Sequence, residues 1–153
     1  MTLYDELHAL IRRLQEAGVD YALCGGLAMA AHGWPRATMD VDLLIRESDF
    51  PTIGGIARDL GFTIENPEFA VAGGQIRIRR FVKIAGTKAI PLDLILVCPL
   101  LEPVWNSRGK VVEEHGPVWV VSPEGLMRMK RLRANKQDLA DIERIEGEND
   151  QTG

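Results

Sequence analysis

The fold is decided by one stretch of the sequence, Gly25-Gly26-Leu27-Ala28-Met29-Ala30-Ala31-His32-Gly33-Trp34-Pro35-Arg36-Ala37-Thr38-Met39-Asp40-Val41-Asp42. Its glycine pair follows a short apolar segment, and its alanine-rich centre favours a short helix that Gly33 and Pro35 end. A strand, a glycine turn and a helix together aim backbone N–H groups at an anion. Asp40 and Asp42 are spaced two apart at the start of an apolar run, which places both carboxylates on one face of a strand. The stretch therefore predicts a site for phosphate and a metal ion.

On the N-terminal side, a helix and a strand lead into this stretch. Apolar residues recur at helical spacing between Leu3 and Leu14, which predicts an amphipathic packing helix that stops near Gly18. The segment Tyr21-Ala22-Leu23-Cys24 predicts a short buried strand that runs directly into the glycine pair.

On the C-terminal side, the pattern predicts a strand at 41–45 and a helix that begins at Ser48 or Asp49 and ends at Gly61. Alternation over 75–84 and an apolar run over 89–97 predict a hairpin around the turn Ala85-Gly86-Thr87-Lys88. Further expectations are short strands at 111–112 and 118–121, a helix capped by Ser122, a second helical segment from about Lys136, and a disordered tail over 147–153.

Length and composition fit one domain. The 153 residues are 46% hydrophobic, which is enough for one core and too little for a confident second one. A net charge of −4 argues against a nucleic-acid footprint over the whole surface. The stripe of Arg77, Arg79 and Lys83 is compatible with a local nucleic-acid groove or with a solvated face. A small nucleotide, a protein or an RNA end therefore remains open as the partner.

The two cysteines, Cys24 and Cys98, lie at the edges of apolar runs, so buried free thiols are favoured over a disulfide. This usage fits a reducing compartment. No apolar run approaches the roughly 20 residues needed to span a bilayer, so no membrane partner and a cytoplasmic location are expected.

A third carboxylate stands out in the later strand. Asp93 is the single charge in the run 90–97, where a buried carboxylate is costly unless it has a purpose. Carboxylates on neighbouring strands can hold two divalent ions about 3.5–4 Å apart and orient a triphosphate. We therefore predict catalytic, metal-binding roles for Asp40, Asp42 and Asp93. Mg²⁺ is the expected ion, in two copies and with Mn²⁺ as a substitute, because it takes oxygen ligands.

Phosphate charge also requires donors and cations. The predicted nucleotide-binding residues are Gly25, Gly26, Arg36, Thr38 and Lys130. Lys130 has an alternative reading as an ordinary basic residue at a helix end. Asp138 and Asp141, three apart on one helical face, could pair with Arg or Lys rather than serve the site.

With these residues assembled, the sequence resembles the nucleotidyltransferase superfamily of the polymerase-β type, and within it the minimal bacterial branch that includes the AbiEii-type toxins. The resemblance rests on the glycine pair with Ala28, His32-Gly33, the segment 36–42, and Leu92-Asp93-Leu94. It extends to residues 130–133 and 136–141, which are similar to the Lys and Lys-Asp-x-x-Asp helix of that branch.

The resemblance implies an α/β (α+β) fold, with a short mixed sheet flanked by helices in a nucleotidyltransferase-like domain over residues 1–146. It implies metal-dependent transfer of a nucleoside monophosphate from an NTP, with release of pyrophosphate. Leu27 stands where the wider superfamily often has a phosphate-contacting Ser, and AbiEii-type toxins usually have a longer C-terminal helical region.

Two functional readings follow. The first is a Mg²⁺-dependent nucleotidyltransferase acting on an RNA end, a protein hydroxyl or a small molecule, within a toxin–antitoxin or abortive-infection system. The second is a catalytically weak or inactive nucleotide-binding module with a partner protein. The three carboxylates favour the first reading, while Leu27 and the short C-terminus favour the second.

Overall fold

Two parallel strands at the centre of the sheet carry the fold. Strand β2 (Val41–Ile45) pairs in parallel with β6 (Lys88–Leu96) and antiparallel with β1 (Ala22–Cys24). Most side chains of β2 and β6 are buried, as expected for strands covered on both faces. The register pairs Asp42 with both Cys24 and Asp93, so two of the predicted carboxylates lie on adjacent strands.

The computed structural model describes the backbone of residues 2–152 and the side chains of residues 2–148. Its eight-stranded sheet has the order β3-β5-β6-β2-β1-β8-β7, and β4 also pairs with β5. The outer strands are β3 (Ile64–Glu65), β4 (Phe69–Val71), β5 (Ile76–Ala85), β7 (Gly109–Glu113) and β8 (Gly116–Val120). The sheet is mixed, because β1 and β8 are also parallel.

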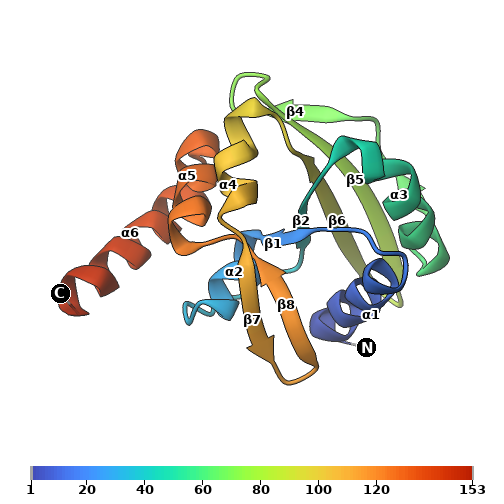
Figure 1. Ribbon diagram of the computed structural model, residues 1–153, viewed down its shortest axis with the longest axis horizontal. Coiled ribbons are helices and arrows are strands. Elements are labelled where there is room, and N and C mark those ends of the chain that lie inside the picture. The colour runs from blue at the N-terminus through green and yellow to red at the C-terminus, as the bar shows by residue number, and fades with distance from the viewer. Residues whose placement is uncertain (1, 153) are drawn as a thin grey trace.

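Helices lie on both sides of this sheet (Figure 1). Helices α1 (Leu3–Glu16) and α3 (Phe50–Asp59) pack together on one side, and α2 (Gly25–Ala31) and α5 (Pro123–Arg133) on the other. The short helix α4 (Glu102–Asn106) contacts α5, and α6 (Lys136–Thr152) extends away from the sheet toward the C-terminus. None of the helices in this described part of the chain is long and apolar enough to cross a membrane.

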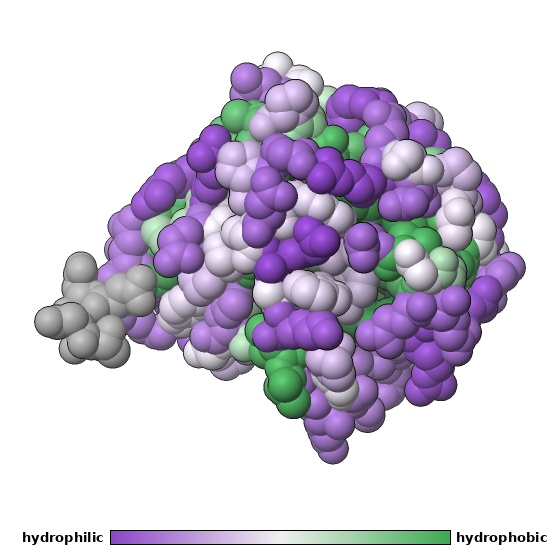
Figure 2. Space-filling view, viewed as in Figure 1, coloured by the Kyte–Doolittle hydropathy of each residue, from purple (hydrophilic) through white to green (hydrophobic). Residues whose placement is uncertain are grey.

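The surface is consistent with a well-buried core. On the face shown in Figure 2, hydrophobic areas are small and separated by hydrophilic residues. The stripe of basic residues on β5 is largely neutralised, because Arg77 binds Glu47 and Glu68 while Arg79 lies 3.4 Å from Glu65. The solvated reading of this stripe is therefore the one that the ion pairs support.

The predicted elements are largely confirmed, including the mixed sheet flanked by helices. The hairpin of β5 and β6 forms around the predicted turn, with Ala85 paired to Lys88. Ser122 caps α5, accepting a hydrogen bond of 2.9 Å from the N–H of Gly125. Cys24 and Cys98 are free thiols, as expected, but only Cys24 is buried and Cys98 is half-buried. The short elements β3, β4 and α4 were not predicted, because two to five residues show no periodicity.

A disordered tail was expected over 147–153, and helix α6 occupies most of that segment. Helix α6 continues to Thr152, and residue 153 lies outside the described residues. Residues 147–152 include no proline, and Gly147, the one glycine among them, costs only about 1 kcal/mol relative to alanine.

An ion pair with a buried carboxylate joins α1 to β5. Glu6 is only 3% exposed, and its carboxylate accepts a 3.0 Å hydrogen bond from Lys83 Nζ. The ammonium group also lies 5.9 Å from the centre of the Phe62 ring. Because the Glu6 carboxylate is buried, the stability of the folded protein depends on the pairing of this charge with Lys83.

Lys83→Met should therefore destabilise the protein by about 3 kcal/mol, since the apolar stem is kept while the Glu6 charge is left unpaired. Urea denaturation measures the loss. Lys88→Met, at an exposed position of the same hairpin, is the control and should change stability little. Equal losses in the two variants, or failure of Glu6→Gln to restore stability to Lys83→Met, would contradict the role of the pair.

Candidate functional site

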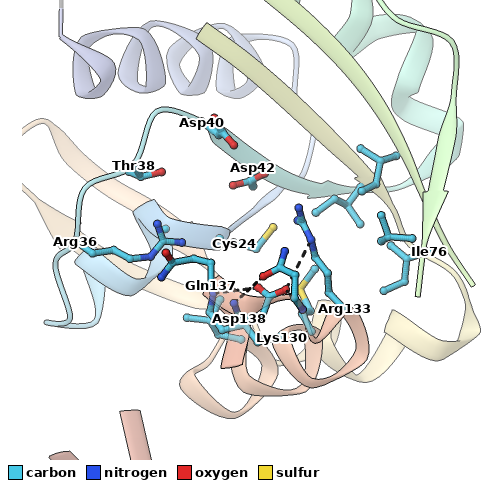
Figure 3. Close-up of a pocket in the computed structure, with 18 of the residues that line it drawn as sticks. Cys24, Arg36, Thr38, Asp40, Asp42, Ile76, Lys130, Arg133, Gln137 and Asp138 are labelled. Carbon is cyan, nitrogen blue, oxygen red and sulfur yellow. Dashed lines mark hydrogen bonds and ion pairs between the residues drawn. The ribbon is translucent and has the colours of Figure 1, made fainter. Parts of the chain in front are cut away.

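A cavity of about 380 Å³ opens between the start of β2 and helices α5 and α6 (Figure 3). It contains the two predicted carboxylates at the β2 start and the predicted cations Arg36 and Lys130. Its lining residues are Cys24, Gly25, Gly26, Arg36, Ala37, Thr38, Met39, Asp40, Asp42, Val71, Ile76, Ile78, Ile95, Leu126, Met129, Lys130, Arg133, Asn135, Gln137 and Asp138. All the predicted site residues except Asp93 therefore line one cavity.

The glycine pair allows the chain to pass close to the carboxylates. Gly25 has φ of +67°, and a Cβ atom there would overlap the Asp42 carboxylate. A Cβ atom on Gly26 would lie 2.8 Å from Thr38 Oγ1 and 3.2 Å from Arg36 Cζ. Only glycine fits at Gly25, because both the backbone conformation and the space exclude a side chain. The pair thus permits the approach of α2 to β2 and to the 34–40 segment.

Asp40 and Asp42 share a strongly acidic environment. Burial of its carboxyl group, followed by the charges of Asp93 and Asp40, raises the pKa of Asp42 to about 7. The pKa of Asp40 is also raised, first by burial and then by Asp93, with Arg80, Arg133 and Arg36 opposing the shift. Three carboxylates are thus close enough to repel one another, and a bound cation would relieve that repulsion.

Asp93 is placed differently from the other two carboxylates. It lies next to Asp42 in the sheet, but it is 2% exposed and its oxygens accept hydrogen bonds of 2.6 and 2.9 Å from Arg80. In the described part of the chain, no three His, Cys, Asp or Glu side chains are arranged so that they could hold a metal ion. The joint metal role of Asp40, Asp42 and Asp93 stays a prediction, and it requires Asp93 to leave Arg80.

The cations of the site are organised by a buried carboxylate on α6. Asp141 is 2% exposed and accepts 2.7 Å hydrogen bonds from Lys130 Nζ and from Gln137 Nε2. Arg36 Nε lies 3.2 Å from Asp141 Oδ1, but the angle gives no hydrogen bond, so this contact is electrostatic. Burial opposes ionisation of Asp141, yet the bonds from Lys130 and Gln137 lower its pKa overall. Asp141 therefore pairs with a lysine and an arginine, and both of these are predicted site residues.

The loop that carries Arg36 is held by two contacts on the N-terminal side of that residue. His32 Nε2 lies 2.7 Å from the backbone carbonyl of Val121, and because a carbonyl oxygen can only accept, the ring donates from that nitrogen. Arg144 of α6 donates a 2.7 Å hydrogen bond to the carbonyl of Pro35. Helix α6 thus positions the Arg36 loop as well as the cations.

Two cationic residues of the site were missed from the sequence. Arg133 lines the cavity one helical turn after Lys130, a spacing that could have revealed it. Arg80 pairs with Asp93 across the hairpin, and counting back from the four-residue turn gives this register. Asp138 also pairs with cations, lying 3.8 Å from Lys130 and 3.7 Å from Arg133.

Comparison with solved structures identifies the fold class. The chain is similar to TM1012 of Thermotoga maritima, a candidate nucleotidyltransferase, with a TM-score of 0.61 at 15% identity over 99% of this chain and 95% of that one. It is similar to ANT(2'')-Ia in complex with adenylyl-2''-tobramycin, with a TM-score of 0.65 at 13% identity over 95% and 87% of the two chains. JHP933 from Helicobacter pylori gives a TM-score of 0.53 at 16% identity over 91% and 62%.

The chain therefore has the fold found in nucleotidyltransferases. No family model matches its sequence, and no curated protein matches it either. At these identities the likeness concerns the fold alone, and the chemistry has to be argued from the site.

Proposed function

We propose that this protein is a Mg²⁺-dependent nucleotidyltransferase, which transfers a nucleoside monophosphate from an NTP to an acceptor hydroxyl. The observation that carries the proposal is the cavity itself, in which Asp40 and Asp42 face Arg36, Lys130 and Arg133. The carboxylates, which can hold a metal ion, and the basic side chains, which can bind phosphates, lie on opposite walls of the same cavity. This is the arrangement that a metal-bound triphosphate requires.

The residues take separate roles in the proposed reaction. Asp40 and Asp42 would hold the divalent ion, which supplies charge neutralisation at the phosphates. Arg36, Lys130 and the Gly25-Gly26 segment would bind the triphosphate, with Thr38 beside them. The acceptor oxygen forms a bond to the α-phosphorus as the bond to the β-phosphate oxygen breaks and pyrophosphate leaves. The hydroxyl proton would pass to Asp93 after that carboxylate separates from Arg80 and turns toward the cavity, which it does not line in this structure.

The direct test follows the label of an α-labelled NTP. Incubation with Mg²⁺ and a cell extract should give labelled product with the wild type and none with Asp42→Ala. Asp59→Ala, an exposed carboxylate on α3, is the control and should label like the wild type. Label with all three proteins, or with none, would overturn the enzymatic assignment.

A catalytically weak nucleotide-binding module is the second candidate, and one observation favours it. Arg80 holds both oxygens of Asp93, which is the state expected if the third carboxylate never binds metal.

Arg80→Gln separates the two candidates. In an active enzyme, Arg80 competes with the metal for Asp93, so the variant should bind Mn²⁺ about tenfold more tightly, as measured by calorimetry. Unchanged Mn²⁺ affinity would favour the second candidate. Arg79→Gln, on the other face of β5, is the matched control and should leave Mn²⁺ affinity as in the wild type.

We also propose a cytoplasmic location and an AbiEii-like role beside a partner protein. Two free cysteines support the reducing compartment. The toxin–antitoxin role rests on the sequence resemblance, and expression in a bacterial host tests it. Growth arrest by the wild type but not by Asp42→Ala would support the role, and normal growth in both cases would count against it.

A further inference from the structure

The cavity has two unlike ends, with Asp40 and Asp42 between them. In Figure 3, Arg36 and Thr38 lie at one end, Ile76 lies at the other, and the two carboxylates lie between. We call the second end the aliphatic end. It is formed by Val71, Ile76, Ile78 and Ile95.

The sheet builds the aliphatic end from three neighbouring strands. Val71 of β4 pairs with Ile76 of β5, and Ile78 of β5 pairs with Ile95 of β6. Ile76, Ile78 and Ile95 line the cavity but are only 3%, 2% and 5% exposed, so the core side of the cavity is apolar here. A cavity of about 380 Å³ can hold a small molecule, whereas it cannot hold the bulk of an RNA or a protein surface.

The chemistry of the aliphatic end does not suit a nucleobase. Recognition of a base uses hydrogen bonds to its polar edges or stacking on an aromatic ring. The four side chains that form this end offer neither. The polar end has Thr38 and Gln137 beside Arg36, and it therefore suits the nucleotide better.

A polycationic acceptor does not suit this cavity either. Asp138 is paired with Lys130 and Arg133, and Asp40 and Asp42 are the proposed metal ligands. Arg133, which also lines the cavity, would repel an ammonium group.

We propose that the aliphatic end binds the acceptor, and that the acceptor is a small, uncharged molecule whose hydroxyl is carried on an apolar body. The inference rests on the proposed function for the identity of the reacting group. With the apolar body against Ile76 and Ile78, the hydroxyl lies toward Asp40 and Asp42, where the α-phosphorus would be held. Apolar burial then supplies the binding energy, and the carboxylate end fixes the position of the reacting oxygen.

Binding of 2-naphthol, a fluorescent hydroxyl compound with an apolar body, tests the aliphatic end without any turnover. One molecule should bind per chain, and Ile78→Thr and Val71→Thr should weaken binding about fivefold or more because they place a hydroxyl in the apolar wall. Ile84→Thr, at a 58% exposed position of the same strand, should bind as the wild type does. Near-ultraviolet circular dichroism checks that each variant is folded. If Ile78→Thr does not fold, Val71→Thr still tests the apolar wall, because threonine has nearly the same shape as valine.

Saturating Mg²⁺ with a non-hydrolysable NTP analogue should leave 2-naphthol bound. Displacement by the nucleotide would overturn the inference, because the aliphatic end would then hold the base. Equal binding by all the variants, or no binding to the wild type, would overturn it as well.

Transfer from an α-labelled NTP then separates this inference from the proposed function. Label should appear on 2-naphthol and not on tobramycin or on a short RNA with a free 3' hydroxyl. Label on RNA or tobramycin alone would overturn the inference while supporting nucleotidyl transfer. Label on none of the three would count against the proposed function, and the binding comparison would still decide what the aliphatic end holds.

Discussion

Replacing Asp42 with Asn should abolish nucleotidyl transfer and at the same time make the metal-free protein more stable. Transfer should fall on the order of 10³-fold, because the variant loses a charged ligand at the reacting phosphates. Stability should rise because the folded state no longer has to hold an ionised carboxylate beside Asp93 and Asp40. A label-transfer assay and urea denaturation, both at pH 7.5, measure the two effects.

The pH dependence of this gain follows from the direction of the pKa shift. The pKa of Asp42 is about 7 in the folded state and 3.8 without perturbation, so the unfolded chain loses this proton at lower pH than the folded one. Wild-type stability is therefore unaffected by this group below about pH 4 and decreases as the pH rises toward 7. Above pH 7, Asp42→Asn should be more stable by about 2 kcal/mol, after allowance for the fact that the residue as a whole is only half-buried and that the new amide is imperfectly bonded.

Divalent ions provide the internal control for this prediction. At 100 times its dissociation constant, Mg²⁺ should stabilise the wild type by about 2.7 kcal/mol and the Asn variant much less. A variant that is no more stable than the wild type at pH 8, or a gain that persists at pH 4, would show that the Asp42 carboxylate is not the destabilising group.

Gly25→Ala should cause the second large effect, a loss of about 4 kcal/mol in stability together with loss of transfer. Alanine at φ +67° is strained by about 1–3 kcal/mol, and its methyl group would overlap the Asp42 carboxylate. Gly18→Ala is a matched control, since Gly18 has φ +68° but has nothing within 4 Å of the added carbon. Thermal denaturation of the two variants separates backbone strain from the clash.

Gly18→Ala should therefore lose about 1–2 kcal/mol and keep full transfer activity. Equal losses of stability in the two variants, or an active Gly25→Ala protein, would mean that the close approach of α2 to β2 has no functional importance.

The sequence was sufficient for the parts of the site that depend on local pattern. The Gly-Gly turn and the Asp-x-Asp strand are short-range signals, so the sequence predicted that Gly25, Asp40 and Asp42 belong to one site. In the structure all three line the same cavity. A central apolar strand with one acid likewise indicated Asp93 and its neighbourhood. The positions of these residues could be predicted because turns and strand periodicity are determined by residues that are close together in the sequence.

The remaining features depend on partners far apart in the chain. The bidentate contact of Arg80 with Asp93, and the contacts that Asp141 makes with Lys130 and Arg36, require the tertiary arrangement of the elements involved. The aliphatic end also needs three strands to come together in register. Periodicity predicts which face of a helix or strand a residue occupies, but it does not predict which residue of another element packs against that face.

The turn between β5 and β6 has a consequence for how this chain can vary. Surface turns usually accept insertions and deletions, since their backbone faces solvent. Here Ala85 pairs with Lys88, and the same ladder pairs Arg80 with Asp93. One added or lost residue would flip the faces of one strand relative to the other and separate the arginine from its carboxylate. Natural relatives that keep this site should therefore keep the length of this turn even where its residues change.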